Sequence, residues 1–157
     1  VRQNDFVFNM TIKENILLDD EFTEEEFFDA VRKAKVNKFV YLLENGYDTV
    51  VGERGGKLSD RQRQRIAIAR AVIRKPKILV LHEATSGVDS QMEEEIFDEQ
   101  KEEDMTLVII SHRLSTIRKA DGVLVLNQGR VVEEGTHEEL MASSCVYKDI
   151  IESQLAV

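Results

Sequence analysis

Two short, continuous runs of apolar residues stand out in the hydrophobic pattern of the chain. The first is Ile78-Leu79-Val80-Leu81, and the second lies within 106–110. An uninterrupted run of this length is typical of a strand covered on both faces, as in a parallel sheet between helices. Segments with helical spacing lie before, between and after the two runs. The pattern therefore predicts a layered α/β domain with a mostly parallel sheet flanked by helices.

Helical sequence precedes the first run. Thr23 and Glu26 have the spacing of a capping box, which predicts a helix. Its apolar positions follow at helical spacing: Phe27, Phe28, Val31 and Ala34. Residues 37–44 predict a second short helix, with Leu42 among its inward-facing positions and Gly46 near its C-terminus.

A longer helix leads into the first strand. It begins at Ser59 or Asp60, either of which is a good N-cap, and it continues to about Arg74. Pro76 prevents further helix. A polar helix is predicted over 89–103, between the two strands.

The C-terminal part combines a hairpin with helices. Residues 115–119 predict a short helix. Two apolar segments, 122–126 and 130–134, flank Asn127-Gln128-Gly129, which is a hairpin signal. A capping box at 136–139 then opens a helical C-terminus.

Composition and charge narrow the possible functions. The 157 residues carry a formal net charge of −9, so phosphodiester backbones are repelled and general nucleic-acid binding is not expected. The single cysteine, Cys145, excludes an intrachain disulfide and a cysteine-based metal site. No apolar run approaches the ~20 residues of a membrane helix. Because the chain does not begin with Met, we expect it to be part of a longer protein.

Candidate chemistry follows the ends of the two predicted strands. Glu83 comes soon after the first strand, and His112 follows the second. Asp89 lies a few residues beyond Glu83. In an open α/β sheet, ligands gather at the carboxyl ends of the strands, so we expect these side chains to approach one crevice.

Several segments resemble motifs of the ATP-binding-cassette (ABC) ATPases, in the order in which that family carries them. VRQNDFVFNMTIKENI resembles the Q-loop region of exporters, and GERGGKLSDRQRQRIAIARAVIRKPKILVL resembles the signature stretch. ILVLHEATSGVD resembles the Walker B strand and D-loop, LVIISHRLSTIRKAD the switch-histidine segment, and NQGRVVEEGTHEELM the C-terminal hairpin and helix. The resemblance implies a partial P-loop NTPase-like ABC domain over 1–157, with a helical subdomain over about 15–60 and the core motifs over about 61–157.

The resemblance assigns roles to residues that match the motifs. Glu83 resembles the catalytic carboxylate that polarises the attacking water, and His112 resembles the switch histidine that contacts the γ-phosphate. Gln3 resembles the Q-loop glutamine, which senses Mg²⁺ and that water. Asp89 resembles the D-loop aspartate that bridges two domains of a dimer. Outside these motifs, the same residues would be an exposed carboxylate, a structural histidine, a loop amide and a helix N-cap.

The signature segment departs from its usual form, Leu-Ser-Gly-Gly-Gln. By the resemblance, Ser59, Asp60, Arg61 and Gln62 contact nucleotide held by an opposite domain, with the Ser59 hydroxyl on the γ-phosphate. Ser59 alternatively acts as a helix cap, and one residue can do both. Asp60 and Arg61 replace the two glycines that let backbone N–H groups approach the phosphate. We expect the Asp60 carboxylate to lie against the γ-phosphate and to repel it, and we expect Arg61 to offset the negative charge of Asp60.

Two further departures affect the binding of Mg²⁺ and ATP. The resemblance assigns the metal to Gln3 and to the position of His82, where the Walker B aspartate normally stands. Imidazole is a poor ligand for this hard cation. No Gly-x-x-x-x-Gly-Lys-Ser/Thr phosphate loop occurs in the sequence. We therefore predict that the chain alone binds ATP very weakly and does not hydrolyse it.

The resemblance implies an ATP hydrolase domain of an exporter, at the cytoplasmic face of the membrane, with ATP and Mg²⁺ as its ligands. Its partners would be a second nucleotide-binding domain, identical or different, and a transmembrane domain. One alternative is a non-catalytic ABC-like binding or regulatory module, or a decayed copy. Others are a soluble ABC ATPase of DNA repair or chromosome maintenance, and an unrelated α/β protein.

Overall fold

The computed structural model describes residues 1, 6–82, 98–99, 105–111, 113–143 and 146–155. The chain forms two compact units, 1–110 and 111–157, and each is described by itself. The first unit contains α1 (Ile12–Leu17), α2 (Glu24–Lys33), α3 (Asn37–Val40), η1 (Gly46–Asp48), η2 (Glu53–Gly55), α4 (Asp60–Val72), β1 (Ile78–His82) and β2 (Thr106–Ile110). The second contains α6 (Leu114–Lys119), β3 (Val123–Asn127), β4 (Arg130–Gly135), α7 (His137–Ser143) and α8 (Val146–Leu155).

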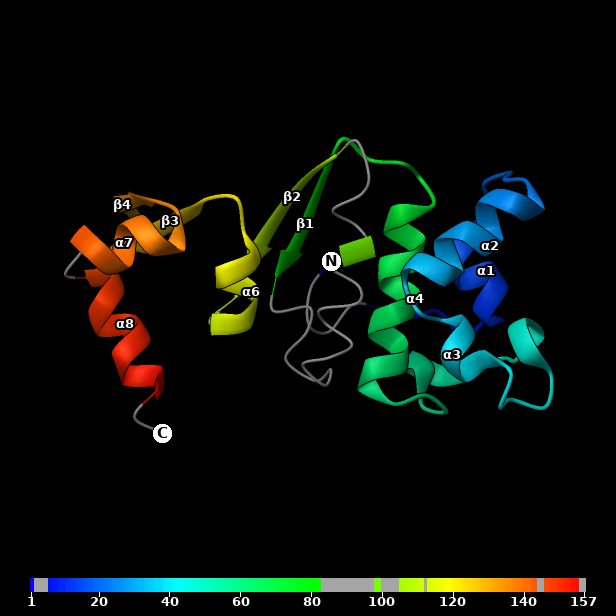
Figure 1. Ribbon diagram of the computed structural model, residues 1–157. Helices are drawn as coiled ribbons and strands as arrows, with labels where there is room; N and C mark the ends of the chain where they lie inside the picture. Colours follow the sequence, from blue (N-terminus) through cyan, green and yellow to red (C-terminus); the bar gives the residue numbers. More distant parts are fainter. Residues whose placement is uncertain (2–5, 83–97, 100–104, 112, 144–145, 156–157) are drawn as a thin grey trace. The chain divides into compact units, whose positions relative to one another are not determined.

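The first unit is packed around α4. This helix lies between the β1–β2 pair on one side and α1, α2 and α3 on the other (Figure 1). Residues 64–69 are all buried, as expected for a helix that has neighbours on every side. The apolar core around α4 draws on both layers, and its members include Ile16, Val31, Phe39, Ile66 and Leu79.

The ends of α4 differ slightly from those predicted. Ser59, rather than Asp60, is the N-cap. The helix ends at Val72, short of the predicted end near Arg74. Lys75, the residue before Pro76, adopts a positive φ of 46°.

The two apolar runs form a parallel pair, as predicted. Ile78 lies opposite Thr106, and the register continues to His82 opposite Ile110. Val1 binds the other edge of β1: its amino group donates to the Val80 carbonyl at 2.7 Å, and its own carbonyl accepts from the His82 N–H at 2.9 Å. These two bonds follow the pattern of a parallel ladder.

The prediction that both strands are covered on both faces is wrong for the described part of the first unit. Leu79 and Leu81 are buried in the core with α4. Side chains at the alternate positions are exposed: Ile78, Val80, Val108 and Ile110. Successive strand residues point to opposite faces, so a continuous apolar run does not by itself fix how many faces are covered.

The helix predicted over 37–44 is shorter in the structure. It ends at Val40, and its N-cap makes no side-chain hydrogen bond. The N–H groups of Leu42 and Leu43 bond to carbonyls three residues back, as in a tight 3₁₀ turn. Leu42, predicted to face inward, is 73% exposed. Gly46 opens η1 instead of ending α3.

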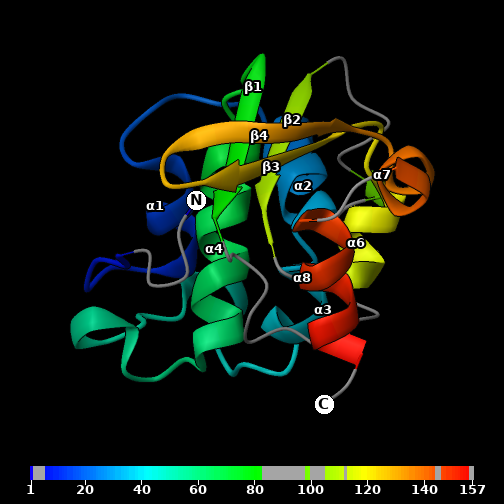
Figure 2. The same ribbon diagram turned by 90° about the vertical axis from the view of Figure 1, so that its left-hand side faces the viewer.

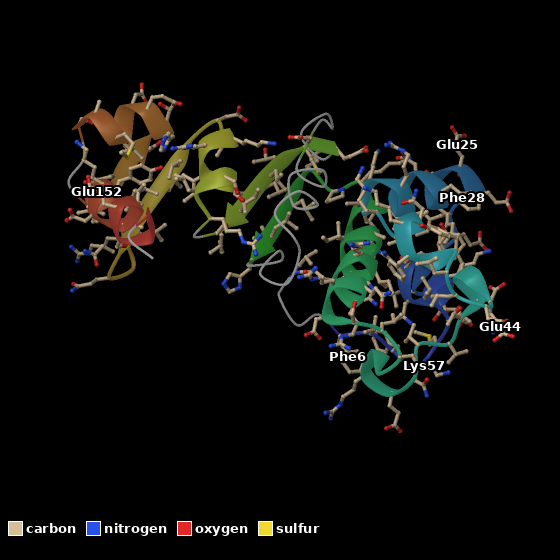
Figure 3. All side chains as sticks on the ribbon, turned by 60° about the horizontal axis from the view of Figure 1, so that its bottom comes forward. Phe6, Glu25, Phe28, Glu44, Lys57 and Glu152 are labelled. Atoms are coloured by element: carbon tan, nitrogen blue, oxygen red, sulfur yellow. The ribbon has the colours of Figure 1, made fainter. Side chains whose placement is uncertain are left out.

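The capping box predicted for α2 is confirmed. The Thr23 hydroxyl accepts from the Glu26 N–H at 3.2 Å, and the Glu26 carboxylate accepts from the Thr23 N–H at 3.0 Å. Phe27 is buried, but Phe28 lies with Glu25 on the exposed side of α2 (Figure 3). The two neighbouring rings point about 100° apart around the helix, so they cannot both face the core.

The sequence analysis missed α1, although a second capping box marks its start. Thr11 and Glu14 cap each other across the first turn. One turn later, Asn15 is completely buried. Its side-chain oxygen accepts from the Phe8 N–H at 2.8 Å, and its amide nitrogen donates to the carbonyls of Phe8 and Thr11. A polar side chain thus replaces a regular ladder for the irregular segment ahead of α1.

Arg70 of α4 and Arg74, which lies just beyond the end of α4, bind the same region. Arg70 donates to the backbone carbonyl of Asn15 at 2.7 Å, to its side-chain oxygen at 3.1 Å and to the Phe6 carbonyl at 2.8 Å. Arg74 donates to the carbonyls of Ile16 and Leu17. The carbonyls at the end of α1 therefore obtain partners from a neighbouring helix.

The second unit contains the predicted hairpin and helices (Figure 2). β3 and β4 pair antiparallel around Gln128 and Gly129, which both have positive φ, as a hairpin turn of the primed type requires. The capping box at 136–139 is present. The Glu133 carboxylate of β4 accepts the first N–H groups of α8, from Val146 at 3.2 Å and Tyr147 at 2.9 Å.

We expect Asn15→Ala to lower the free energy of unfolding by about 3 kcal/mol, because it leaves buried backbone groups without partners. Urea unfolding followed by circular dichroism measures this change. Asn45→Ala is the matched control, since Asn45 is exposed and makes no capping bond. Equal effects of the two substitutions would contradict the role assigned to Asn15.

Candidate functional site

The structure describes part of the predicted site. Ser59, Asp60, Arg61, Gln62 and His82 fall within the described residues. Four other predicted site residues lie outside them: Gln3, Glu83, Asp89 and His112. The roles of these four, and the helix predicted over 89–103 apart from its residues 98–99, therefore stay predictions.

The elements that carry the described site residues meet at one end of the first unit. α4 and β1 run in opposite directions, so the N-terminus of α4 and the carboxyl end of β1 lie toward the same end (Figure 1). β1 ends at His82 and β2 ends at Ile110, directly opposite each other in the register. This is the edge of a parallel sheet at which ligands gather in open α/β folds.

Ser59 and Gln62 form a capping box at the start of α4. The Ser59 hydroxyl oxygen accepts from the Gln62 N–H at 3.3 Å, and the Gln62 side-chain oxygen accepts from the Ser59 N–H at 2.8 Å. Ser59 is exposed, so the cap stands at the surface. The first N–H groups of the helix and its dipole make this end partly positive.

The Asp60 carboxylate pairs with Arg63, one turn further along α4. The sequence analysis gave Arg61 the task of offsetting this charge, but Arg63 makes the contact in the structure. Sequence spacing contains a signal for it, since oppositely charged residues three apart are neighbours on a helix surface. Asp60 remains largely exposed, with 75% of its side chain accessible to solvent.

Arg63 also holds the turn over 55–58, which directly precedes Ser59. One of its terminal nitrogens donates to the Leu58 carbonyl at 2.8 Å and to the Gly55 carbonyl at 3.2 Å. Gly55 has a φ of +71°, and a Cβ there would stand 2.7 Å from both the Arg63 and Val7 side chains. Only glycine suits a position with this backbone conformation and this close approach.

His82 ends β1 with an exposed side chain. Within the described residues, no three His, Cys, Asp or Glu side chains gather in a group that would hold a metal ion. A single imidazole at this position does not fit Mg²⁺, which prefers oxygen ligands in octahedral geometry. His82 therefore offers no oxygen ligand for Mg²⁺ at the end of β1, and the strand itself is formed as predicted.

An ion-pair cluster joins Glu99 to Arg32 of α2 and to Lys35, just beyond the end of α2. Lys35 contacts the Glu99 carboxylate at 2.7 Å, and Arg32 contacts it at 2.5 Å. The Lys35 ammonium, and then the Arg32 guanidinium, hold the pKa of Glu99 below its ordinary value because they favour the ionised form. The sequence analysis did not predict this contact, since Arg32 and Glu99 are far apart in the chain.

Across the part of the chain that the structure describes, helices are too short or too polar to cross a membrane.

A sequence model of the family described as ABC transporter matches residues 1–86. Multidrug resistance protein 3 of Entamoeba histolytica is 46% identical over 160 residues, which cover 98% of this chain and 12% of that protein. The ATP-dependent lipid A-core flippase of Mannheimia succiniciproducens is 44% identical over 158 residues, which cover 98% of this chain and 27% of that protein. The chain thus spans 12% and 27% of the lengths of these two relatives.

A solved structure of a bacterial Atm1-family ABC exporter with ATP bound has a similar fold. The TM-score is 0.92, the sequence identity is 39%, and the match covers 98% of this chain and 28% of that one. This likeness confirms the predicted fold class, an α/β domain related to the P-loop NTPases.

We expect Gly55→Ala to destabilise the first unit by about 2 kcal/mol, because the new methyl group meets two side chains at a strained φ. The adjacent Gly56→Ala is the control. Gly56 has a φ of −60°, and its Cβ would stand 3.3 Å from the Glu53 carbonyl oxygen. Thermal unfolding of both variants checks the difference, and a Gly55→Ala protein as stable as the Gly56→Ala protein would refute it.

Proposed function

Since the chain belongs to the ABC transporter family, we propose that it is part of the nucleotide-binding domain of an exporter, where it takes part in binding and hydrolysing ATP. The observation that carries the proposal is the Ser59-capped N-terminus of α4, which lies toward the same end of the first unit as the carboxyl end of β1. A helix N-terminus beside such a sheet edge suits a phosphate group. The proposed organisation is a helical subdomain over about 15–60 and core motifs over about 61–157.

Ser59 is the described residue best suited to contact a phosphate. Its oxygen accepts a hydrogen bond within the cap, and its hydroxyl proton stays available to donate to an anion. Capping and binding are thus compatible in one side chain. In the proposed arrangement, Ser59 and its neighbours Asp60, Arg61 and Gln62 face nucleotide held by an opposite domain.

The other proposed roles follow the family motifs. Glu83 polarises the attacking water, His112 contacts the γ-phosphate, and Gln3 senses Mg²⁺ and the water. Asp89 bridges two nucleotide-binding domains. Positioning and electrostatic stabilisation are what a protein contributes to phosphoryl transfer, and these polar side chains are suited to both.

The proposed partners are a second nucleotide-binding domain, identical or different, and the transmembrane domain of an exporter. The chain would then work at the cytoplasmic face of a membrane. The net charge of −9 argues against the DNA-repair alternative, since it repels a phosphodiester backbone. DNA binding that weakens steeply with salt would favour that alternative instead.

The residues of the chain fit ATP and Mg²⁺ unequally. The capped N-terminus of α4 fits a phosphate, whereas the His82 imidazole does not fit Mg²⁺. This mismatch favours one second candidate, a non-catalytic ABC-like module or decayed copy that keeps the fold and a partner surface. Capture of a membrane partner equally well with and without nucleotide would support the second candidate.

In the complete exporter, we expect His82→Asp to raise Mg²⁺-dependent ATP turnover by about tenfold or more, because a carboxylate restores the oxygen ligand. Phosphate release as a function of Mg²⁺ concentration measures the effect. His82→Asn is the matched control, since it supplies an oxygen without the charge and should restore much less. Unchanged turnover in His82→Asp would count against the Walker B assignment.

We expect the 157 residues by themselves to bind ATP very weakly and not to hydrolyse it, because the phosphate-loop pattern is absent from them. Calorimetric titration with ATP and Mg²⁺ checks this expectation. A micromolar Kd would contradict it.

A further inference from the structure

We propose that Arg63 is a positioning residue: it holds the turn over 55–58 and thereby fixes where Ser59 stands. We also propose that its pair with Asp60 draws that carboxylate along the helix surface, away from the N-terminus of α4. The inference rests on the proposed function, because the placement of Ser59 affects ATP only where this end of α4 meets nucleotide. Arg63 itself needs no contact with the nucleotide for this role.

One guanidinium binds the chain on both sides of Ser59. Before Ser59, it donates to the carbonyls of Leu58 and Gly55, at 2.8 and 3.2 Å. After Ser59, it pairs with the Asp60 carboxylate. Because Leu58 and Asp60 are the direct neighbours of Ser59, these contacts fix the direction in which the chain enters α4 and hence where the Ser59 hydroxyl stands.

Close packing limits the freedom of Arg63. Its side-chain stem passes over Gly55, where a Cβ would stand 2.7 Å from the Arg63 Cδ. The same Cβ would also stand 2.7 Å from Cγ2 of Val7, which is 2% exposed. The guanidinium is therefore held by the packing of its side-chain stem as well as by its hydrogen bonds, so the side chain has little rotational freedom.

The Asp60 contact has an electrostatic consequence. A free carboxylate in the first turn of α4 would repel a phosphate approaching the same helix end. Pairing with Arg63 neutralises this charge locally. The pair is exposed to solvent, so its effect on an anion is modest, a change of several-fold in affinity.

The test uses the complete exporter with its partner domain. We expect Arg63→Gln to raise the KM for ATP about fivefold, while kcat changes less than about twofold, since a contact of about 1 kcal/mol is lost. Arg63→Lys should restore part of the loss, because an ammonium keeps the charge but not the fork of donors. In an Asp60→Gly background, Arg63→Gln should raise KM less, because there is no carboxylate left to release.

Arg74, just beyond the other end of α4, provides a matched control. Its guanidinium also binds two backbone carbonyls, those of Ile16 and Leu17, and it pairs with Asp20. It lies just beyond the opposite end of α4, which ends at Val72. Arg74→Gln should destabilise the protein to a similar extent but leave the KM for ATP unchanged. An equal rise in KM from Arg74→Gln would overturn the proposal, because both effects would then be general destabilisation.

Hydrogen–deuterium exchange without nucleotide gives a readout that does not depend on activity. We expect Arg63→Gln to speed exchange of the backbone amides over 55–63, and Arg74→Gln to leave that segment unchanged. Unchanged exchange in Arg63→Gln would refute the positioning role, whatever the kinetics show. Absence of ATP turnover in the unsubstituted exporter would instead refute the proposed function, and the exchange result would still decide what Arg63 does.

Discussion

Three arginines, two in α4 and one just beyond its end, bind backbone carbonyls of neighbouring parts of the first unit. Arg63 and Arg70 lie seven residues apart, which places them on one side of α4, and Arg74 follows the end of the helix at Val72. Their guanidinium groups bind backbone carbonyls over 55–58, at Phe6 ahead of α1, and at the end of α1. α4 is buried on every side over 64–69, so the three side chains extend from a rigid support. The turn over 55–58 and the segment 6–17 are therefore both held by arginines that extend from α4 or from just beyond its end.

Features that depend on local sequence could be predicted. The predicted capping box at Thr23 involves residues three apart, the N-cap of α4 is one of the two predicted residues, Ser59, and the hairpin depends on its own turn. The parallel pairing of β1 and β2 follows from two apolar runs with helical sequence between them. The signal for α1 was equally local, since Thr11 and Glu14 have the same capping spacing.

Features that depend on distant neighbours could not be predicted from one sequence. Leu42 is as apolar as the buried residues near it, and nothing local shows that the chain turns away before a partner reaches it. The same holds for Val80, which is 43% exposed although its neighbours Leu79 and Leu81 are buried. The burial of Asn15 is the opposite case: a polar residue becomes central because Arg70, 55 positions later, satisfies its oxygen. Hydrophobicity alone therefore predicts the burial of these three residues wrongly, since contacts with distant parts of the chain determine which of them is buried.

The two departures from the family motifs differ physically. Asp60 brings a negative charge to a helix N-terminus, where an acidic side chain is itself favourable, and Arg63 forms an ion pair with it. His82 has no such compensation among the described residues, and its imidazole replaces the oxygen chemistry that Mg²⁺ needs. The start of α4 thus accommodates the Asp60 carboxylate through its pair with Arg63, whereas the exposed His82 imidazole at the end of β1 offers Mg²⁺ no oxygen ligand. A helix end that suits an anion and a strand end that suits Mg²⁺ poorly therefore occur together in the first unit.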